Sequence, residues 1–217
     1  MITLSGIIRE NMTFGSGDTV SLSGNVQLAE GYTITLGAGS ALLGNSNRIE
    51  VFGTLDISGT SDRLTEIDNL HILQKSTGSV SMSFSHYKGK GISTAGNSTD
   101  DTNFSISNSV IEILSFIEYL IMYAELKLPG LSVVTGNIFS NTNIVLSNDV
   151  PLRSNTFIGD STILTGGEID LVGNNFLSTD SRSVYHAGVD FLTLRSGDEV
   201  TASGNYWATE NASEIQG

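Results

Sequence analysis

The chain has 217 residues, of which 39% are hydrophobic and only 15% are charged, and it contains 24 glycines and two prolines. Its net charge of −13 argues against binding to nucleic acid or to an anionic membrane, because both partners are bound by clustered Lys and Arg and the ten basic residues here are scattered. The composition is typical of many short strands and turns, and no linker interrupts it. We therefore expect one domain over residues 1–217.

The chain has no cysteine, which removes disulfides and thiolate metal sites and is compatible with an exported bacterial protein. Residues 1–10 lack the basic region and the continuous apolar core of a signal peptide, so no export signal is expected within the chain. The most apolar window, residues 110–128, contains Glu112, Glu118 and Glu125. These three carboxylates argue against insertion of the window into a membrane.

In chain order, short segments rich in Val, Ile, Leu and Thr alternate with clusters of Gly, Asn, Ser and Asp, a pattern typical of short strands joined by turns. The segments expected to form strands are residues 19–22, 32–36, 49–52, 54–58, 67–73, 80–84, 104–107, 133–134, 143–146, 162–164, 168–172 and 191–194. Residues 111–128 are dense enough in apolar side chains for one helix or for two consecutive buried strands. The neighbouring repeats favour strands.

A four-residue motif recurs in the second half of the chain, with a small residue, Asn, any residue and an aromatic. Its copies are residues 136–139, 154–157, 173–176 and 204–207, and their asparagines, Asn137, Asn155, Asn174 and Asn205, are spaced by 18, 19 and 31 residues. A degenerate copy lies at residues 107–110, with Asn108 in the Asn position, and a weaker one ends at Tyr87. A solenoid allows such unequal spacing, because each coil keeps its strands in register while its loops vary in length.

The motif predicts how each coil closes. Its Asn tolerates the left-handed backbone of a turn, and the amide can bond to the Asn of the neighbouring coils. The aromatic two residues later points into the core, where Phe176 is expected to stack between rings of adjacent coils. Phe104 and Phe191 are expected to be exposed.

These patterns together predict the fold class. We expect an all-β chain folded as a single-stranded right-handed parallel β-helix, a solenoid of about eight to nine coils with three short strands in each. A jelly roll or another β-sandwich is the alternative, because these folds also consist of short strands and turns.

Two blocks of the sequence resemble a known group of proteins. Residues 22–58 (LSGNVQLAEGYTITLGAGSALLGNSNRIEVFGTLDIS) are similar to the opening coils of many exported β-helix proteins. Residues 204–207 are similar to the Asn-Tyr-Trp-Gly that often closes such repeats, although Ala208 stands in place of the glycine. On these residues the chain resembles the right-handed parallel β-helix repeat proteins of the pectate-lyase-like superfold. In that group the chain often runs further after the closing motif, so the resemblance implies that this chain can be a piece of a larger protein.

This resemblance implies a fold without implying one activity, because the superfold includes lyases, hydrolases, epimerases, adhesins and phage tailspikes. Its lyases use clustered Asp residues to hold calcium together with an Arg or Lys base, and its polygalacturonases use paired Asp and a Gly-His-Gly. Neither set is recognisable in this sequence. Asp100 and Asp101 form the only adjacent Asp pair, and their Ser, Thr and Asn rich surroundings indicate an exposed loop.

The richest group of chemically active side chains fills the longest gap between the repeats. Its members are Asp180, Arg182, Tyr185, His186, Asp190 and Arg195. Arg could pair with the carboxylate of an acidic sugar, and His or Tyr could move protons. The ordinary interpretation is a solvated loop, so these residues stay catalytic candidates and no catalytic residue, cofactor or metal site is assigned. His71 and His86 are single residues beside strands, expected at surface or stacked positions.

Two functions remain open. The first is a non-enzymatic structural or adhesive module of a secreted or cell-surface protein, with a polysaccharide or a cell surface as its partner. The alternative is a carbohydrate-active enzyme, a lyase or epimerase acting on acidic polysaccharide. A solenoid face of Ser, Thr and Asn would favour the module, and a groove lined by carboxylates and Arg would favour the enzyme. Ice binding is disfavoured, because residues 33–35 are the only clear Thr-x-Thr copy. The oligomeric state is not predicted.

Overall fold

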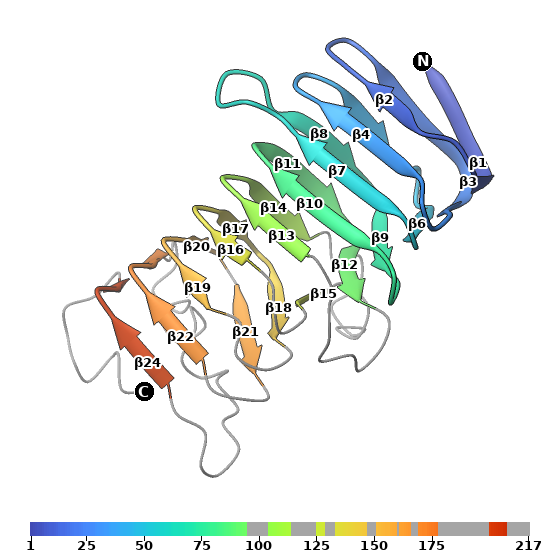
Figure 1. The fold of residues 1–217 in the computed structure, drawn as a ribbon. Helices are drawn as coiled ribbons and strands as arrows, with labels where there is room; N and C mark the ends of the chain where they lie inside the picture. The colour runs from blue at the N-terminus through green and yellow to red at the C-terminus, as the bar shows by residue number, and fades with distance from the viewer. Residues whose placement is uncertain are drawn as a thin grey trace.

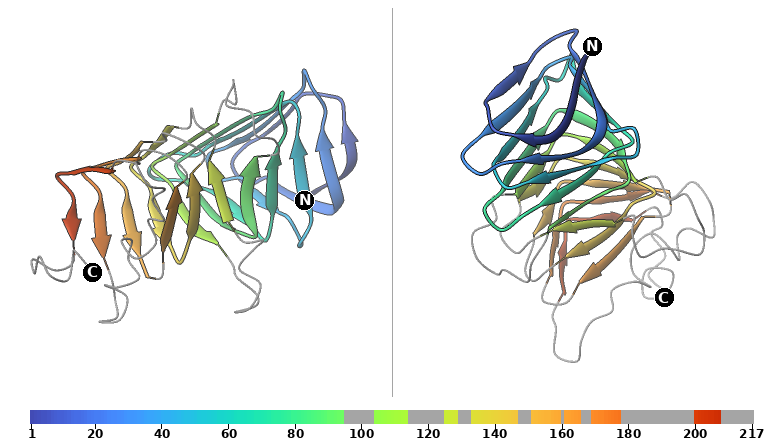
Figure 2. Two further views of the ribbon diagram at one scale, coloured as in Figure 1. Left: turned by 90° about the horizontal axis from the view of Figure 1, so that it is seen from below. Right: turned by 90° about the vertical axis from the view of Figure 1, so that its right-hand side faces the viewer.

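The computed structural model of the chain describes residues 1–94, 104–113, 125–128, 133–146, 151–159, 161–165, 169–177 and 200–207. Within these residues all regular secondary structure is β-strand, and the strands stack along one axis (Figure 1). The N-terminus lies at one end of the stack, and the last described strands lie at the other (Figure 2). The all-β parallel solenoid expected from the repeats is confirmed.

The strands form three faces of parallel pairs, which we call faces 1, 2 and 3. Face 1 consists of β2 (Met12–Phe14), β4 (Thr33–Gly37), β7 (Thr54–Ser58), β10 (Ser79–Ser83), β13 (Phe104–Ser107), β16 (Val133–Thr135), β19 (Leu152–Arg153), β22 (Ile169–Val172) and β24 (Val200–Ser203). Face 2 consists of the first part of β3 (Thr19–Leu28), then β5 (Ala41–Leu43), β8 (Thr65–Asp68), β11 (Ser85–Gly89), β14 (Val110–Ile113), β17 (Ile138–Ser140), β20 (Thr156–Ile158), β23 (Asn175–Leu177) and β25 (Tyr206–Trp207). Face 3 consists of the second part of β3, then β6 (Arg48–Val51), β9 (His71–Gln74), β12 (Gly91–Thr94), β15 (Glu125–Leu128), β18 (Asn143–Leu146) and β21 (Thr162–Thr165).

About six coils, from the one that begins with β4 to the one that begins with β19, contain three separate strands. At the N-terminal end β3 runs from face 2 to face 3 as one strand, and β1 (Ile2–Ile8) pairs along it. At the C-terminal end the described residues of the last two coils contribute strands to faces 1 and 2. The predicted number of about eight to nine coils was too high, since about six coils are complete. The predicted number is approached only if the partial coils at the two ends are counted as well.

Strict alternation explains why each segment forms a strand with one face inside. In β7 the side chains of Leu55 and Ile57 are buried, while Thr54, Asp56 and Ser58 point outward. Parallel register then places equivalent positions of successive coils side by side. One inward column on face 1 therefore consists of Phe14, Leu36, Ile57, Met82, Ile106, Val134, Leu152 and Leu171.

The asparagines of the repeat form the ladder that the sequence predicted. The backbone N–H of Asn137 donates to Oδ1 of Asn155 (3.0 Å), and that of Asn155 donates to Oδ1 of Asn174 (2.9 Å). Each amide nitrogen also donates to a carbonyl, as Nδ2 of Asn155 does to Val134 (3.2 Å). The buried amides of this ladder therefore find their hydrogen-bond partners in neighbouring coils. The left-handed residue of this turn is the small residue before the Asn, such as Gly136 (φ 70°), rather than the Asn itself.

Earlier coils fill the same turn with shorter side chains. Ser85 and Ser109 occupy the ladder position, and the Ser109 N–H donates to Oδ1 of Asn137 (3.0 Å). Asn108 instead has the left-handed conformation (φ 50°), so the prediction that it takes the Asn position of the motif was wrong by one residue. Phe84 holds the equivalent left-handed position with φ 45°, a strained conformation for a bulky residue.

The aromatic side chains of the repeat stack inside face 2, as predicted. The ring centroids of Phe139 and Phe157 are 5.2 Å apart, and those of Phe157 and Phe176 are 4.9 Å apart with planes 8° apart. Strand spacing sets this distance, since neighbouring coils lie about 4.8 Å apart. Tyr87 belongs to the same inward column, where its hydroxyl donates to the carbonyls of Leu70 (2.6 Å) or Gly91 (2.7 Å). Burial raises the pKa of this hydroxyl.

Three other expectations are resolved by the described strands. Residues 67–73 form two strands rather than one, because Asn69 (φ 52°) turns the chain between β8 and β9. Phe104 is buried beside Val80, so its expected exposure was wrong. The two ends of the 111–128 window lie in β14 and β15, which agrees with the preference for strands there. Phe191 and the expected strand at residues 191–194 lie outside the described residues.

We predict that Phe176→Ala lowers the free energy of unfolding by about 3 to 5 kcal/mol, because it removes a ring packed inside the core and leaves a cavity. Urea denaturation measures this change. Leu177→Ala is the matched control: its side chain is 37% exposed on the outer side of the same strand, and its cost should stay near about 0.5 kcal/mol. An unchanged urea midpoint for Phe176→Ala would contradict the packing of this ring.

Candidate functional site

Most of the candidates chosen from sequence lie outside the described residues. This holds for Asp180, Arg182, Tyr185, His186, Asp190 and Arg195, and also for Asp100 and Asp101. Their grouping around an acidic sugar stays a prediction. Within the described residues, the side chains that could form a site lie on the outer surfaces of the three faces.

Face 1 carries an ordered array of hydroxyl groups on its outer side. We call this array, over β2 to β16, the hydroxyl face; its members are Thr13, Thr33, Thr35, Thr54, Ser58, Ser79, Ser81, Ser83, Ser105, Ser107 and Thr135. In-register pairing places these residues in three columns along the solenoid axis. Adjacent rungs lie about 4.8 Å apart, and alternate residues of a strand lie about 7 Å apart. The result is a flat grid of groups that both donate and accept hydrogen bonds.

One carboxylate interrupts the central column of this grid. Asp56 lies between Thr35 and Ser81, and the Ser81 hydroxyl donates to its Oδ1 (2.8 Å). Further along face 1 the pattern changes, with Val133 exposed and Arg153 paired to Asp170. The hydroxyl face is thus confined to the N-terminal and central coils.

The sequence held a signal for this face that a search for Thr-x-Thr alone did not detect. Residues 79–83 read Ser-Val-Ser-Met-Ser, and residues 104–107 read Phe-Ser-Ile-Ser. Serine therefore continues the columns that contain Thr33 and Thr35. The continuity becomes visible only when the register between coils is known.

Face 2 carries ionisable side chains on its outer side in the central coils. Nδ1 of His86 lies 3.1 Å from Oε2 of Glu66, and Nζ of Lys88 lies 3.8 Å from Oε1 of Glu112. Asp68 pairs in register with Lys88. His86 is therefore at the surface, as predicted. These half-exposed pairs contribute little to stability because solvent screens them.

Face 3 places His71 next to a serine hydroxyl. Nε2 of His71 lies 3.0 Å from Oγ of Ser93 on the next strand. His71 pairs in register with Gly91, and its ring extends to the adjacent outward column, which contains Leu73 and Ser93. The pKa of His71 is lowered, first by burial and then by the positive charges of Arg48 and Lys90. The imidazole is therefore neutral at pH 7 and able to bond to the hydroxyl. His71 is a partly buried, bonded side chain at the edge of β9, in line with the surface or stacked position expected for it.

A neutral imidazole beside a hydroxyl is one part of a nucleophilic site, which also needs a group that orients the ring. Within the described coils, no carboxylate pairs with His71, and Glu50 instead pairs with Arg48 (2.8 Å) and Lys75 (3.8 Å). The same coils contain no cluster of three His, Asp or Glu side chains suited to a metal ion. The arrangement on face 3 accounts for the local structure of this strand edge and is not assigned a reaction.

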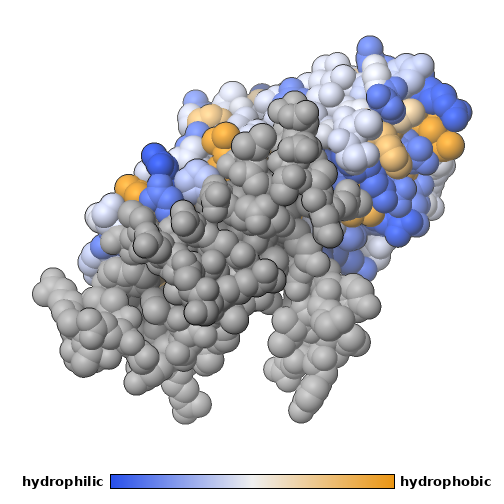
Figure 3. All heavy atoms as spheres, turned by 60° about the horizontal axis from the view of Figure 1, so that its bottom comes forward, coloured by the Kyte–Doolittle hydropathy of each residue, from blue (hydrophilic) through white to orange (hydrophobic). Residues whose placement is uncertain are grey.

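On the side of the molecule drawn in Figure 3, the described residues are mostly hydrophilic, and hydrophobic residues appear as separate orange spots. No helix among the described residues has the length and hydropathy needed to cross a membrane. In comparisons with known proteins, no family model, no curated protein and no solved structure matches the chain.

We predict that His71 titrates below its ordinary pKa of 6.5 in the folded chain. The unfolded chain then binds the proton first, so stability should fall as the pH drops from 6.5 to the pKa of the folded state and level off below it. NMR titration of the ring signals measures the pKa. Arg48→Gln should raise it part of the way toward 6.5, whereas Lys88→Gln on face 2 should leave it unchanged. A pKa at or above 6.5 would contradict the burial of this ring.

Proposed function

We propose that the chain is a non-enzymatic structural or adhesive module of a secreted or cell-surface bacterial protein, built as a member of the pectate-lyase-like superfold. The hydroxyl face is its recognition surface, and a polysaccharide or a hydrated cell surface is its partner. The in-register hydroxyl columns of face 1 are the observation that carries this proposal.

The chemistry of these columns matches a polyhydroxylated partner. Ser and Thr hydroxyls each offer one donor and two acceptor positions, so they can pair with sugar hydroxyls directly or through water. Short side chains on a flat sheet also lose little rotamer freedom on binding, which reduces the entropy cost of each contact. Many weak contacts along one face then add up to adhesion without a deep pocket.

The interior supports a stiff spacer as the structural part of this role. Neighbouring coils are joined by parallel strand pairing along the three faces, and the coils that carry β17, β20 and β23 are joined also by the buried Asn ladder and by the stacked rings of Phe139, Phe157 and Phe176. Such a stack resists bending because any bend opens packed rungs on one side. A rigid rod holds its recognition face flat and at a fixed distance from the point of attachment.

Retention on solid surfaces tests the adhesive role. We expect the chain to stay bound, after washing, to insoluble polysaccharide or to bacterial cell surfaces. Ser105→Lys should reduce the retained fraction several-fold, because a long side chain in the central column keeps the flat face away from its partner.

Gln27→Lys is the matched control, since it adds the same charge at an outward position of face 3. Equal loss in both variants would contradict recognition by the hydroxyl face. No retention of the native chain on any of these surfaces would contradict the adhesive role altogether.

Incubation with acidic polysaccharides tests the alternative, a lyase or epimerase. We expect no turnover of pectate, alginate or similar uronic polymers, with or without calcium, followed by the ultraviolet absorbance of unsaturated products and by NMR of the sugar configuration. Abstraction of a proton next to a uronate needs a positioned base and a cation that neutralises the carboxylate. Turnover that disappears in Arg182→Ala or His186→Ala would replace the proposed module by the enzyme.

A further inference from the structure

The outer surface of face 2 changes character along the solenoid. On β8, β11 and β14 it carries the ionisable residues Glu66, Asp68, His86, Lys88 and Glu112. On β17, β20, β23 and β25, every outward residue is uncharged. The charged and the uncharged residues occupy the same two outward columns of face 2. Equivalent positions are therefore charged in the central coils and uncharged in the C-terminal coils.

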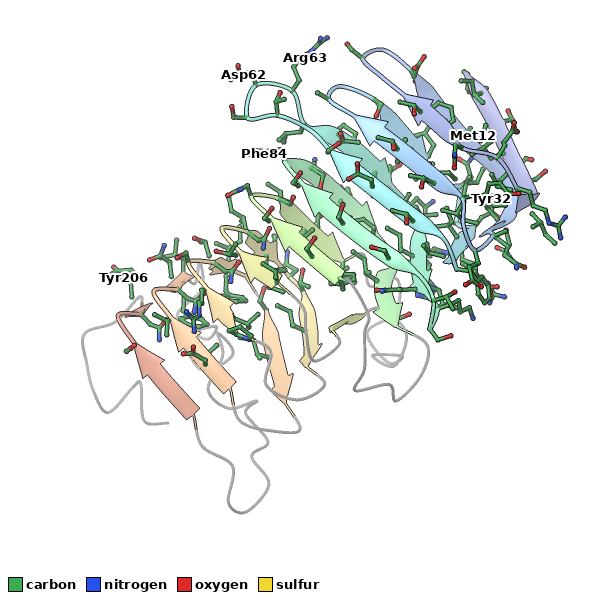
Figure 4. The ribbon with its side chains drawn as sticks, viewed as in Figure 1. Met12, Tyr32, Asp62, Arg63, Phe84 and Tyr206 are labelled. Atoms are coloured by element: carbon green, nitrogen blue, oxygen red, sulfur yellow. The ribbon has the colours of Figure 1, made fainter. Side chains whose placement is uncertain are left out.

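Three of the uncharged residues are large apolar side chains exposed to solvent. Tyr206 is 54% exposed, Ile138 is 40% exposed and Leu177 is 37% exposed. Tyr206 is the only aromatic among the strongly exposed hydrophobic residues of the described chain. Figure 4 shows it at the end of the stack opposite to Met12 and Tyr32.

Tyr206 lies in one column with two groups that form hydrogen bonds. It pairs in register with Asn175, which pairs in turn with Thr156. The amide Nδ2 of Asn175 donates to Oγ1 of Thr156 (3.3 Å), which holds the amide against the sheet with its oxygen available. An exposed ring, an amide and a hydroxyl therefore follow one another along the solenoid axis.

From this column we infer that a neutral polysaccharide binds along the outer surface of β20, β23 and β25, with a hexose ring stacked on Tyr206 and its hydroxyls bonded to Asn175 and Thr156. A pyranose has an apolar C–H face and a rim of hydroxyls, so an aromatic ring beside an amide and a hydroxyl complements both. Rungs about 4.8 Å apart let a chain that runs parallel to the axis contact one coil after another. Ile158 and Leu177, in the adjacent column, extend the apolar contact.

The net negative charge of the protein favours a neutral ligand over an anionic one. A net charge of −13 repels an anionic polymer at a distance, and no cation stands among the outward residues of β17, β20, β23 and β25 to offset that repulsion. A neutral sugar carries no net charge and is not repelled by the negative charge of the protein. The inference rests on the proposed adhesive role but uses a different face, so the two can fail separately.

Affinity electrophoresis of the full chain in gels containing a soluble β-glucan, mannan or dextran tests the inference. At least one of these neutral polymers should retard the native chain, and pectate should not. Tyr206→Ala should weaken the binding by about tenfold, because the stacking platform is lost. Tyr206→Phe, which keeps the ring, should retain most of the affinity. Fluorescence of Trp207, the only tryptophan and the next residue along the chain, provides a second readout of binding.

Ile7→Ala is the control, since it removes a comparably exposed apolar side chain from β1 in the first coil, and it should leave binding unchanged. Unchanged circular dichroism and urea midpoints show that all variants are folded. Equal binding by Tyr206→Ala and the native chain, or no retardation by any neutral polymer, would overturn the inference. If Ser105→Lys removes surface retention while Tyr206→Ala has no effect, the adhesive role stands and this subsite does not.

Discussion

Parallel pairing of each coil with the coil before and the coil after it is the constraint on which the rest of this structure depends. A strand inside such a stack has its backbone groups satisfied only if it pairs with both neighbours, and the buried side chains fix the register of that pairing. Inward residues then meet inward residues, and turn residues meet turn residues. Columns such as Phe14 to Leu171 on face 1, and the Asn ladder at the turn before face 2, are consequences of that one condition.

Register also explains why polar groups tolerate burial here. Asn155 is fully buried, yet its oxygen accepts the N–H of Asn137 and its amide donates to the carbonyl of Val134. An isolated coil could not satisfy these groups, because each partner comes from another coil. The buried polar turn and the apolar core therefore favour the same stacked arrangement, which strengthens the specificity of the fold.

Sequence reasoning reached the fold because the signals that define a coil are local. The Asn-x-Phe copies predicted both the amide ladder and the ring stack at Phe157 and Phe176. The prediction that Asn108 occupies the ladder position was wrong, because Ser109 occupies that position and Asn108 takes the left-handed position before it. The hydroxyl face was not predicted, because its columns join residues such as Thr35, Asp56 and Ser81 that are far apart in the sequence. Tyr206 likewise became a candidate only when the register placed Asn175 and Thr156 beside it.

The Asn ladder has a direction. In each step the backbone N–H at the turn donates to a side-chain oxygen of the following coil, from Ser85 to Ser109, then to Asn137 and on to Asn205. The row of hydrogen bonds is therefore polar: each turn directs its N–H donor toward the following coil and its side-chain oxygen acceptor toward the preceding coil. A coil that joins the stack after Asn205 continues the row only if it brings an oxygen to that turn.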